Sequence, residues 1–178
     1  IFTLSDGDTW LFQSDGRLLR ITPDEQAMAC RQILGSSHGV RRVISLVQDK
    51  EIIWIISDKG IYKYSKENSK LTLALSTRKH FHSFRKYANK FIIGADNGQL
   101  YIYDPRKDDY SIMKFNTSAT LTRVKAYDSK HLLITAENDG FFLTDGYRGE
   151  GVHYTISNQL LSNEVNALYV EDSQKHIW

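Results

Sequence analysis

The sequence predicts an all-β fold built from repeated four-stranded antiparallel sheets, and three observations carry that prediction. Aromatic residues make up 12% of the 178 residues, with 10 Tyr among them, and such residues favour strands. Apolar pairs spaced three residues apart recur about every 42 residues. Each of the first three pairs is followed by two short apolar runs around a polar turn, with no helical periodicity.

The repeat can be followed along the printed sequence. The apolar pairs are Val40 and Val43, Phe81 and Phe84, Leu121 and Val124, and Val165 and Leu168, spaced 41, 40 and 44 residues apart. The segments after the first three pairs read IIWIISDKGIYKYS, KFIIGADNGQLYIYD and LLITAENDGFFLTD, with turn glycines at Gly60, Gly98 and Gly140. The segment DGDTWLFQSDGRLLRIT near the start repeats the pattern around Gly16.

Each unit is therefore expected to form four strands joined by tight turns. In the second unit these strands are predicted at about 40–48, 51–57, 60–65 and 70–75. One stretch, residues 23–34, invites comparison with a helix, but its apolar residues are poorly spaced for one. We predict a loop and a strand there.

A four-stranded unit of this length cannot bury both of its faces alone, so neighbouring units must stack. Radial stacking of such sheets gives a β-propeller, and a β-sandwich, the alternative, needs no repeat of about 42 residues. We predict a propeller fragment of about four blades. The expected blades are 1–34, 35–76, 77–115 and 116–158, followed by an incomplete blade at 159–178.

The incomplete blade is expected to hold a link, a complete inner strand and the opening of a second strand that ends on Ile177 and Trp178. An open arc would expose apolar sheet faces at its two ends. We therefore expect the remainder of the same propeller chain, or a second copy in a homodimer, as a partner.

Composition excludes several functions. The formal net charge is +2 and the charges are scattered, so no footprint for nucleic acid appears. The single Cys30 excludes an internal disulfide framework and a Cys-based zinc site. The longest apolar run, Ile52–Ile56, is far shorter than a membrane span. The start at Ile1 carries no signal peptide, which we expect of a piece whose targeting signals lie elsewhere.

Three segments resemble the two-component-regulator propeller repeat, whose consensus is roughly L-S-x-N-x-V-x-x-I-x-x-D-x-x-G-x-I-W-I-G-T-x-x-G-L-x-x-Y-D. They are DGDTWLFQSDGRLLRI, IIWIISDKGIYKYS and LLSNEVNALYVEDSQKHIW. The matching positions are Ser162, Asn163, Val165, Leu168, Asp172, Ile177 and Trp178 in the first half and Trp54, Ile55, Gly60, Ile61 and Tyr64 in the second. The chain departs from it at Lys175, at Ile56 and Ser57, and at Phe91 and Leu132.

The resemblance implies a function. Proteins with this repeat are typically extracytoplasmic sensor regions of bacterial hybrid two-component systems, in which a membrane helix and a histidine kinase follow the propellers. It implies a periplasmic part of an inner-membrane protein that senses a polysaccharide or oligosaccharide. The kinase would lie downstream, so we expect this part to bind rather than catalyse, without a metal or other cofactor.

Propellers bind ligands where the loops entering their innermost strands converge, which directs attention to the strand starts. By the repeat these starts lie at residues 38–42, 80–82, 120–123 and 163–166. We single out Arg42 and Arg123, because a guanidinium offers several donors to sugar hydroxyls or to the carboxylate of an acidic sugar. His80 and His82 complete the predicted ligand-binding set. The alternative is that these residues are ordinary charges lining a channel.

Other patterns carry weaker signals. His80 and His82 could form half of a metal site, but no third ligand has suitable spacing. The Asp-box-like SDGDTW at residues 5–10 and the acidic run at 104–109 are both expected to be structural turns. Trp10, Trp54 and Trp178 are expected to pack between blades rather than bind a ligand.

Two other function classes stay open. A protein-interaction scaffold of the WD40 kind would share the period, but the Gly-His and Trp-Asp pairing of that family is missing. A secreted propeller lyase or glycosidase would need converging acids, and the strand starts supply Glu164 alone.

Overall fold

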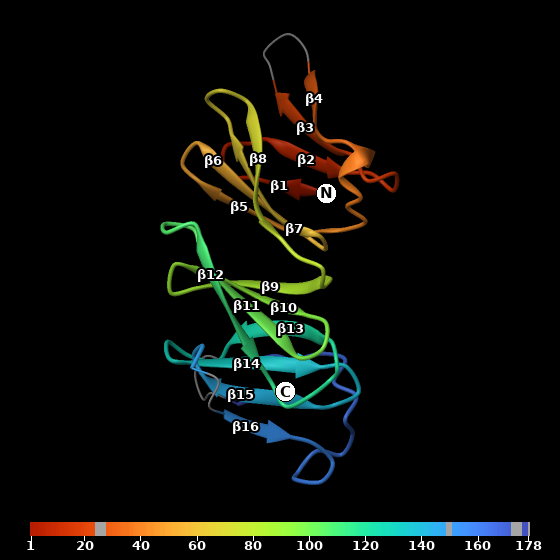
Figure 1. Ribbon diagram of the computed structural model, residues 1–178, viewed down its shortest axis with the longest axis vertical. Helices are drawn as coiled ribbons and strands as arrows, with labels where there is room; N and C mark the ends of the chain where they lie inside the picture. Colours follow the sequence, from red (N-terminus) through yellow and green to blue (C-terminus); the bar gives the residue numbers. More distant parts are fainter. Residues whose placement is uncertain (24–27, 149–150, 172–175, 178) are drawn as a thin grey trace. The chain divides into compact units, whose positions relative to one another are not determined.

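The computed structural model describes residues 1–23, 28–148, 151–171 and 176–177. Its strands form four four-stranded antiparallel sheets, and in every sheet the strands neighbour one another in chain order. One 3₁₀ turn, η1 (Ser36–His38), interrupts the strands, and the described ranges contain no α-helix. The predicted all-β fold with about four propeller blades is confirmed. The chain divides into two compact units, residues 1–80 and 81–178, each with two sheets (Figure 1).

The unit 1–80 holds the first two sheets. Its strands are β1 (Phe2–Thr3), β2 (Thr9–Phe12), β3 (Leu18–Pro23), β4 (Met28–Leu34), β5 (Val43–Asp49), β6 (Ile52–Ser57), β7 (Gly60–Ser65) and β8 (Lys70–Ser76). The strand predicted within residues 23–34 is present as β4, while residues 24–27 of the predicted loop lie outside the described residues. The strand order follows from turns of two to five residues, which can only join antiparallel neighbours.

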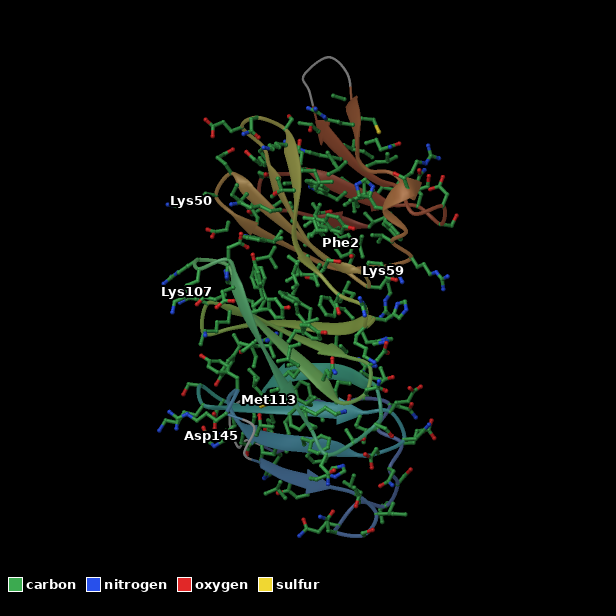
Figure 2. All side chains as sticks on the ribbon, in the orientation of Figure 1. Phe2, Lys50, Lys59, Lys107, Met113 and Asp145 are labelled. Carbon is green, nitrogen blue, oxygen red and sulfur yellow. The ribbon has the colours of Figure 1, made fainter. Side chains whose placement is uncertain are left out.

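Apolar side chains fill the space between the two sheets of this unit (Figure 2). Trp10 is fully buried and meets Tyr64 edge to face, with ring centroids 5.7 Å apart. Ile53 and Ile55 lie two residues apart on β6, so both side chains point to the same face and reach this core. The prediction that Trp10 packs between blades is confirmed. Trp54 is also buried, with the Lys63 ammonium 5.6 Å from its ring, and Trp178 lies outside the described residues.

The unit 81–178 holds the other two sheets. Its strands are β9 (Phe81–Tyr87), β10 (Lys90–Ala95), β11 (Gln99–Asp104), β12 (Asp109–Lys114), β13 (Leu121–Ala126), β14 (His131–Ala136), β15 (Phe141–Asp145) and β16 (Gly151–Tyr154). The acidic run at 104–109 is the turn between β11 and β12, as expected. The core between these sheets includes Ile92, Ile102, Leu132 and Ile134. Phe115 and Phe142 also pack there, with ring centroids 4.6 Å apart.

The first strands of the two sheets in this unit, β9 and β13, lie against each other, as the inner strands of adjacent blades do. The Ser83 hydroxyl donates to the carbonyl of Leu121 across the two sheets at 3.1 Å. Gly94 permits this approach, because a Cβ there would lie 2.6 Å from the same carbonyl oxygen. Larger residues at this position would force the sheets apart.

A β-bulge begins the first strand in three of the sheets. Val43, Phe81 and Leu121 each pair with the last residue of the following strand, and one residue is then skipped. These three residues are therefore equivalent, which corrects the sequence alignment of Phe81 and Leu121 with Val40. Val40 is buried but lies before β5, so its apolar character reflects packing of the link and not membership of the ladder.

The expected inner strand of a fifth blade is not formed in the described part of residues 159–178. An isolated bridge joins Val170 to Ile177, where the first two strands of a blade would pair. A strand needs a hydrogen-bonded neighbour along its length, whereas the described backbone of this segment has that bridge and isolated hydrogen bonds from the Gly140 amide to Asn163 and from Arg123 to Asn166. Its apolar side chains nevertheless cover the last sheet, since Leu168 packs with Leu133 and Phe141.

In the described part of the chain, no helix is both long and apolar enough to cross a membrane.

Candidate functional site

All four predicted site residues lie at one end of the sheets of their own unit, which we call the mouth end. It is the end where the first strand of a sheet starts and where the second strand turns into the third. Arg42 and His80 belong to the unit 1–80, and His82 and Arg123 belong to the unit 81–178. Each pair is described within its own unit.

Asp58 organises the mouth end of the unit 1–80. One of its carboxylate oxygens accepts the backbone N–H groups of Arg41 and Arg42 at 3.1 and 3.2 Å. The backbone N–H of Asp58 in turn donates to the carbonyl of Arg42 at 3.0 Å. Because these amides bond to a side chain, the ladder of β5 begins only at Val43. Arg42 is held by its backbone, and the residue is exposed.

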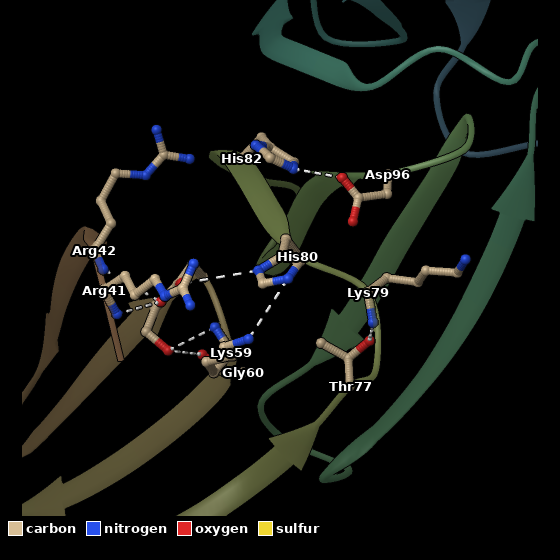
Figure 3. A network of polar contacts seen from close by, with 11 residues as sticks. Arg41, Arg42, Lys59, Gly60, Thr77, Lys79, His80, His82 and Asp96 are labelled. Atoms are coloured by element: carbon tan, nitrogen blue, oxygen red, sulfur yellow. Dashed lines mark hydrogen bonds and ion pairs between the residues drawn. The ribbon is translucent and has the colours of Figure 1, made fainter. Parts of the chain in front are cut away.

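His80 sits on the link before β9, where its ring lies beside Lys59 (Figure 3) and near the carboxylate of Asp58. Its Nδ1 lies 3.8 Å from the second carboxylate oxygen of Asp58, and its Nε2 lies 3.5 Å from the Lys59 ammonium. The structure therefore brings Arg42 and His80 together around Asp58. Arg42 takes part through its backbone N–H, which already donates to Asp58, while its side chain points away from His80 (Figure 3).

His82 occupies the bulge at the start of β9, and bulges redirect side chains. Its Nε2 lies 2.6 Å from a carboxylate oxygen of Asp96, which follows β10 (Figure 3). Both side chains keep about 30% of their surface exposed, at 29% for His82 and 30% for Asp96. The pair is therefore formed within the protein and still reachable by a ligand.

A second polar network at this end of the unit 81–178 surrounds Asp139 in the turn between β14 and β15. The Thr117 hydroxyl donates to its carboxylate at 2.6 Å, and His153 Nε2 lies 2.7 Å from its carbonyl oxygen. The His153 ring stacks on Phe142 with centroids 4.0 Å apart. These contacts tie the link after β12 and strand β16 to the turn.

Arg123 lies in a polar hollow of about 340 Å³ at the mouth end of the unit 81–178, which we call the Arg123 groove. Its lining includes Thr122, Arg123, Glu137, Asn138, Glu164 and Asn166. The guanidinium donates to the carbonyl of Asn166 at 3.0 Å, and the Asn166 amide donates to Glu164 at 3.2 Å. One cation thus faces two carboxylates in a hollow rich in amides and hydroxyls.

The sequence reasoning missed the acids of the mouth end. Asp58, Asp96 and Glu137 each follow directly after the second strand of a sheet, and Asp139 lies two residues later. The predicted starts of the first strands contain Glu164 as their only acid. The signal was present in the repeat, because the turns SDKG, ADNG and AENDG carry an acid at the same place.

The histidines do not form the half-site for a metal that their spacing allowed. His80 faces Asp58 whereas His82 is paired with Asp96, so the two rings serve different carboxylates. Among the residues whose placement is described, no three His, Cys, Asp or Glu side chains gather as a metal site.

No protein-family model and no curated protein matches the sequence. Solved structures do match. The extracellular domain of the hybrid two-component system BT4673 from B. thetaiotaomicron superimposes with a TM-score of 0.72 and 15% identity. That of BT3049 from the same organism gives 0.67 and 14%. PorZ, a surface component of the type-IX secretion system of Porphyromonas gingivalis, gives 0.64 and 11%.

These matches cover 99%, 100% and 93% of this chain but only 25%, 26% and 30% of the matched chains. The chain therefore spans about a quarter of the chains of these two extracellular domains. At such low identity the likeness shows the fold. The fold is that of extracellular domains of hybrid two-component systems, the class of protein that the sequence resemblance named.

Proposed function

We propose that this chain is part of the extracytoplasmic sensor propeller of a hybrid two-component system and that it binds an oligosaccharide at its mouth end. The observation that carries the proposal is the likeness of nearly the whole chain to such extracellular domains. The arrangement of polar groups at the mouth end supports the ligand class, because sugar hydroxyls both donate and accept hydrogen bonds.

The Arg123 groove suits a neutral sugar. Its exposed carboxylates accept hydroxyl protons, while the Arg123 guanidinium and the Asn138 amide donate. A uronic acid would meet two like charges, Glu137 and Glu164, against a single cation. The groove volume of about 340 Å³ is at the small end for ligand sites and fits a short saccharide.

Binding can be tested by screening the purified protein on an array of neutral and acidic oligosaccharides, followed by calorimetry of the best neutral ligand. Arg123→Ala is expected to weaken that affinity roughly tenfold, the loss of a charged hydrogen bond. Its melting temperature should stay unchanged because Arg123 is exposed.

Arg85→Ala is the matched control, since Arg85 is an exposed arginine on β9 of the same unit. It should bind like the parent protein. Absence of any array ligand, or equal affinities of the Arg123 and Arg85 variants, would contradict the proposed site. Arg42→Ala tests the corresponding residue of the other unit in the same assay.

One observation favours a second function, hydrolysis of a glycosidic bond. Glu137 and Glu164 line the same hollow, and glycoside hydrolysis uses two carboxylates flanking the scissile bond. Release of reducing ends from an array ligand, abolished in both Glu137→Gln and Glu164→Gln, would replace sensing by catalysis. Binding without release supports the sensor.

A further inference from the structure

A second hollow in the unit 81–178, which we call the Tyr87 pocket, lies at the end of the sheets opposite the mouth end. Its volume is about 430 Å³, and its lining includes Tyr87, Ser129, Lys130, Asp145, Tyr147 and Arg148. These residues come from the turns after β9, β13 and β15, so both sheets of the unit contribute. Figure 2 labels Asp145 at this end.

The Tyr87 hydroxyl is the most informative group in the pocket. Its oxygen is buried, and no hydrogen-bond partner for it exists among the described residues. A buried hydroxyl without a partner is costly, so such a group in a hollow suggests a ligand atom. Burial, followed by the nearby Asp128, raises the pKa of Tyr87, which keeps the hydroxyl protonated as a donor.

Several other groups of the pocket are charged. Asp145 lies 3.7 Å from the Arg148 guanidinium, and the neighbouring Asp128 accepts from His131 and from two backbone amides. The Lys130 ammonium has no partner among the described residues, and the Arg148 side chain is 79% exposed. Two cations thus line the pocket with one anion, Asp145, whose only side-chain partner in the described part of the chain is Arg148.

The aromatic wall gives the pocket a fixed shape. The rings of Tyr87 and Tyr147 meet edge to face, with centroids 6.2 Å apart. The Lys90 ammonium lies 5.1 Å from the Tyr147 ring centroid. The cation on the Tyr147 ring adds positive potential beside the pocket. Aromatic rings next to charged donors are suited to a ring-shaped ligand that bears an anionic group.

We propose that the Tyr87 pocket binds an anionic oxygen group, carboxylate or sulfate, with the Tyr87 hydroxyl, the Lys130 ammonium and the Arg148 guanidinium as its donors. The ligand class is an acidic saccharide or the free anion. This site is separate from the Arg123 groove and does not depend on the function proposed for that groove.

The test is a titration of the isotope-labelled protein, followed by two-dimensional NMR, with three probes: glucuronate, inorganic sulfate and glucose. Glucuronate is expected to shift the amide signals of the turns after β9, β13 and β15, and glucose is not. If sulfate shifts the same signals with equal affinity, the pocket recognises the anion alone. If glucuronate binds more tightly, it recognises the sugar ring as well.

Two variants and two controls locate the site. Tyr87→Phe keeps the ring and removes the donor, and Lys130→Gln removes the cation; each should weaken glucuronate or sulfate binding roughly fivefold. Tyr110→Phe and Lys107→Gln are the matched controls, since both residues are exposed in the same unit. Unchanged amide spectra outside the pocket show that each variant is folded.

Equal binding of glucose and glucuronate would overturn the proposal, as would the absence of binding by both anions. Shifts that persist unchanged in Tyr87→Phe and in Lys130→Gln would also overturn it, because the anion would then bind elsewhere.

Discussion

The Arg123 groove and the Tyr87 pocket lie at opposite ends of the sheet β13–β16 and have opposite charge balance. The groove sets one arginine against two glutamates, whereas the pocket sets a lysine and an arginine against one aspartate. Acids at the mouth end recur because they follow the second strand of a sheet, where they hold backbone amides or histidines. The turns at the other end also carry acids, at Asp104, Asp128 and Asp145, but in the Tyr87 pocket a lysine and an arginine stand beside them.

The difference in charge between groove and pocket shows that one set of repeated sheets can present two polar surfaces of different charge. The mouth end is constrained by the bulge and by the acids that organise the strand starts. In the unit 81–178 the other end carries the hairpin turns after β9, β11, β13 and β15, and three of these line the Tyr87 pocket. The predictions that follow test this contrast, beginning with the change that should remove both surfaces.

The largest effect is expected from Phe142→Ala. Phe142 is buried between the two sheets. Its ring centroid lies 4.6 Å from that of Phe115 and 4.0 Å from that of His153. Loss of a buried aromatic ring should lower the free energy of unfolding by about 3–5 kcal/mol. Chemical denaturation measures this, with Tyr110→Ala as the exposed control. A loss below about 1 kcal/mol would show that the sheets do not depend on this core.

A smaller loss is expected from Asp58→Ala, which tests whether a mouth-end acid is structural. The variant leaves the backbone N–H groups of Arg41 and Arg42 without their acceptor, at an expected cost of about 1–3 kcal/mol. Asp58→Asn retains an acceptor oxygen and should lose less. Equal stability of the alanine variant and the parent in urea would remove Asp58 from this role.

The charge contrast itself can be changed by replacing Glu137 and Glu164 together with glutamine. Arg123 would then be the only charge among the lining residues named for the groove, and glucuronate should gain a new binding region there. We expect the gain to be about threefold in affinity at low ionic strength and smaller at high salt. NMR shifts at residues 122–123 and 164–166 would report it. Without such shifts, charge does not set the preference of the groove.

The smallest effect concerns acid pH beside the Tyr87 pocket. Burial acts to raise the pKa of Asp128, but hydrogen bonds from the His131 side chain and from the backbone of Lys130 and His131 prevail and lower it to about 2. The unfolded chain takes up this proton near 3.8, so the contribution is complete above that pH and disappears as pH falls towards 2.

Solvent screens this site, which limits the contribution to a few tenths of a kcal/mol. The stability difference between the parent and Asp128→Asn should therefore shrink between pH 6 and pH 2. A difference that stays constant over this range would mean that the carboxylate is not stabilised by these contacts. Urea denaturation at each pH gives the comparison.

The repeat in the sequence was enough to predict the strands, because apolar runs and turn glycines mark them directly. It aligned Val40 instead of Val43 with Phe81 and Leu121, since a buried residue of a link and one of a strand are both apolar. The repeat placed Arg42 and His80 at the same end of the sheets. It did not identify Asp58, because the contacts of Asp58 depend on how the turn after β6 places its carboxylate. The Tyr87 pocket joins turns about 20–60 residues apart, and only three-dimensional packing brings them together.

The central claim is that the mouth end binds an oligosaccharide, and the most direct measurement is calorimetry of the best neutral array ligand on Arg123→Ala and Tyr87→Phe side by side. The account predicts roughly tenfold weaker binding for Arg123→Ala and parental affinity for Tyr87→Phe. Parental affinity for Arg123→Ala with a loss in Tyr87→Phe would contradict it, because the sugar would then bind at the other end of the sheets.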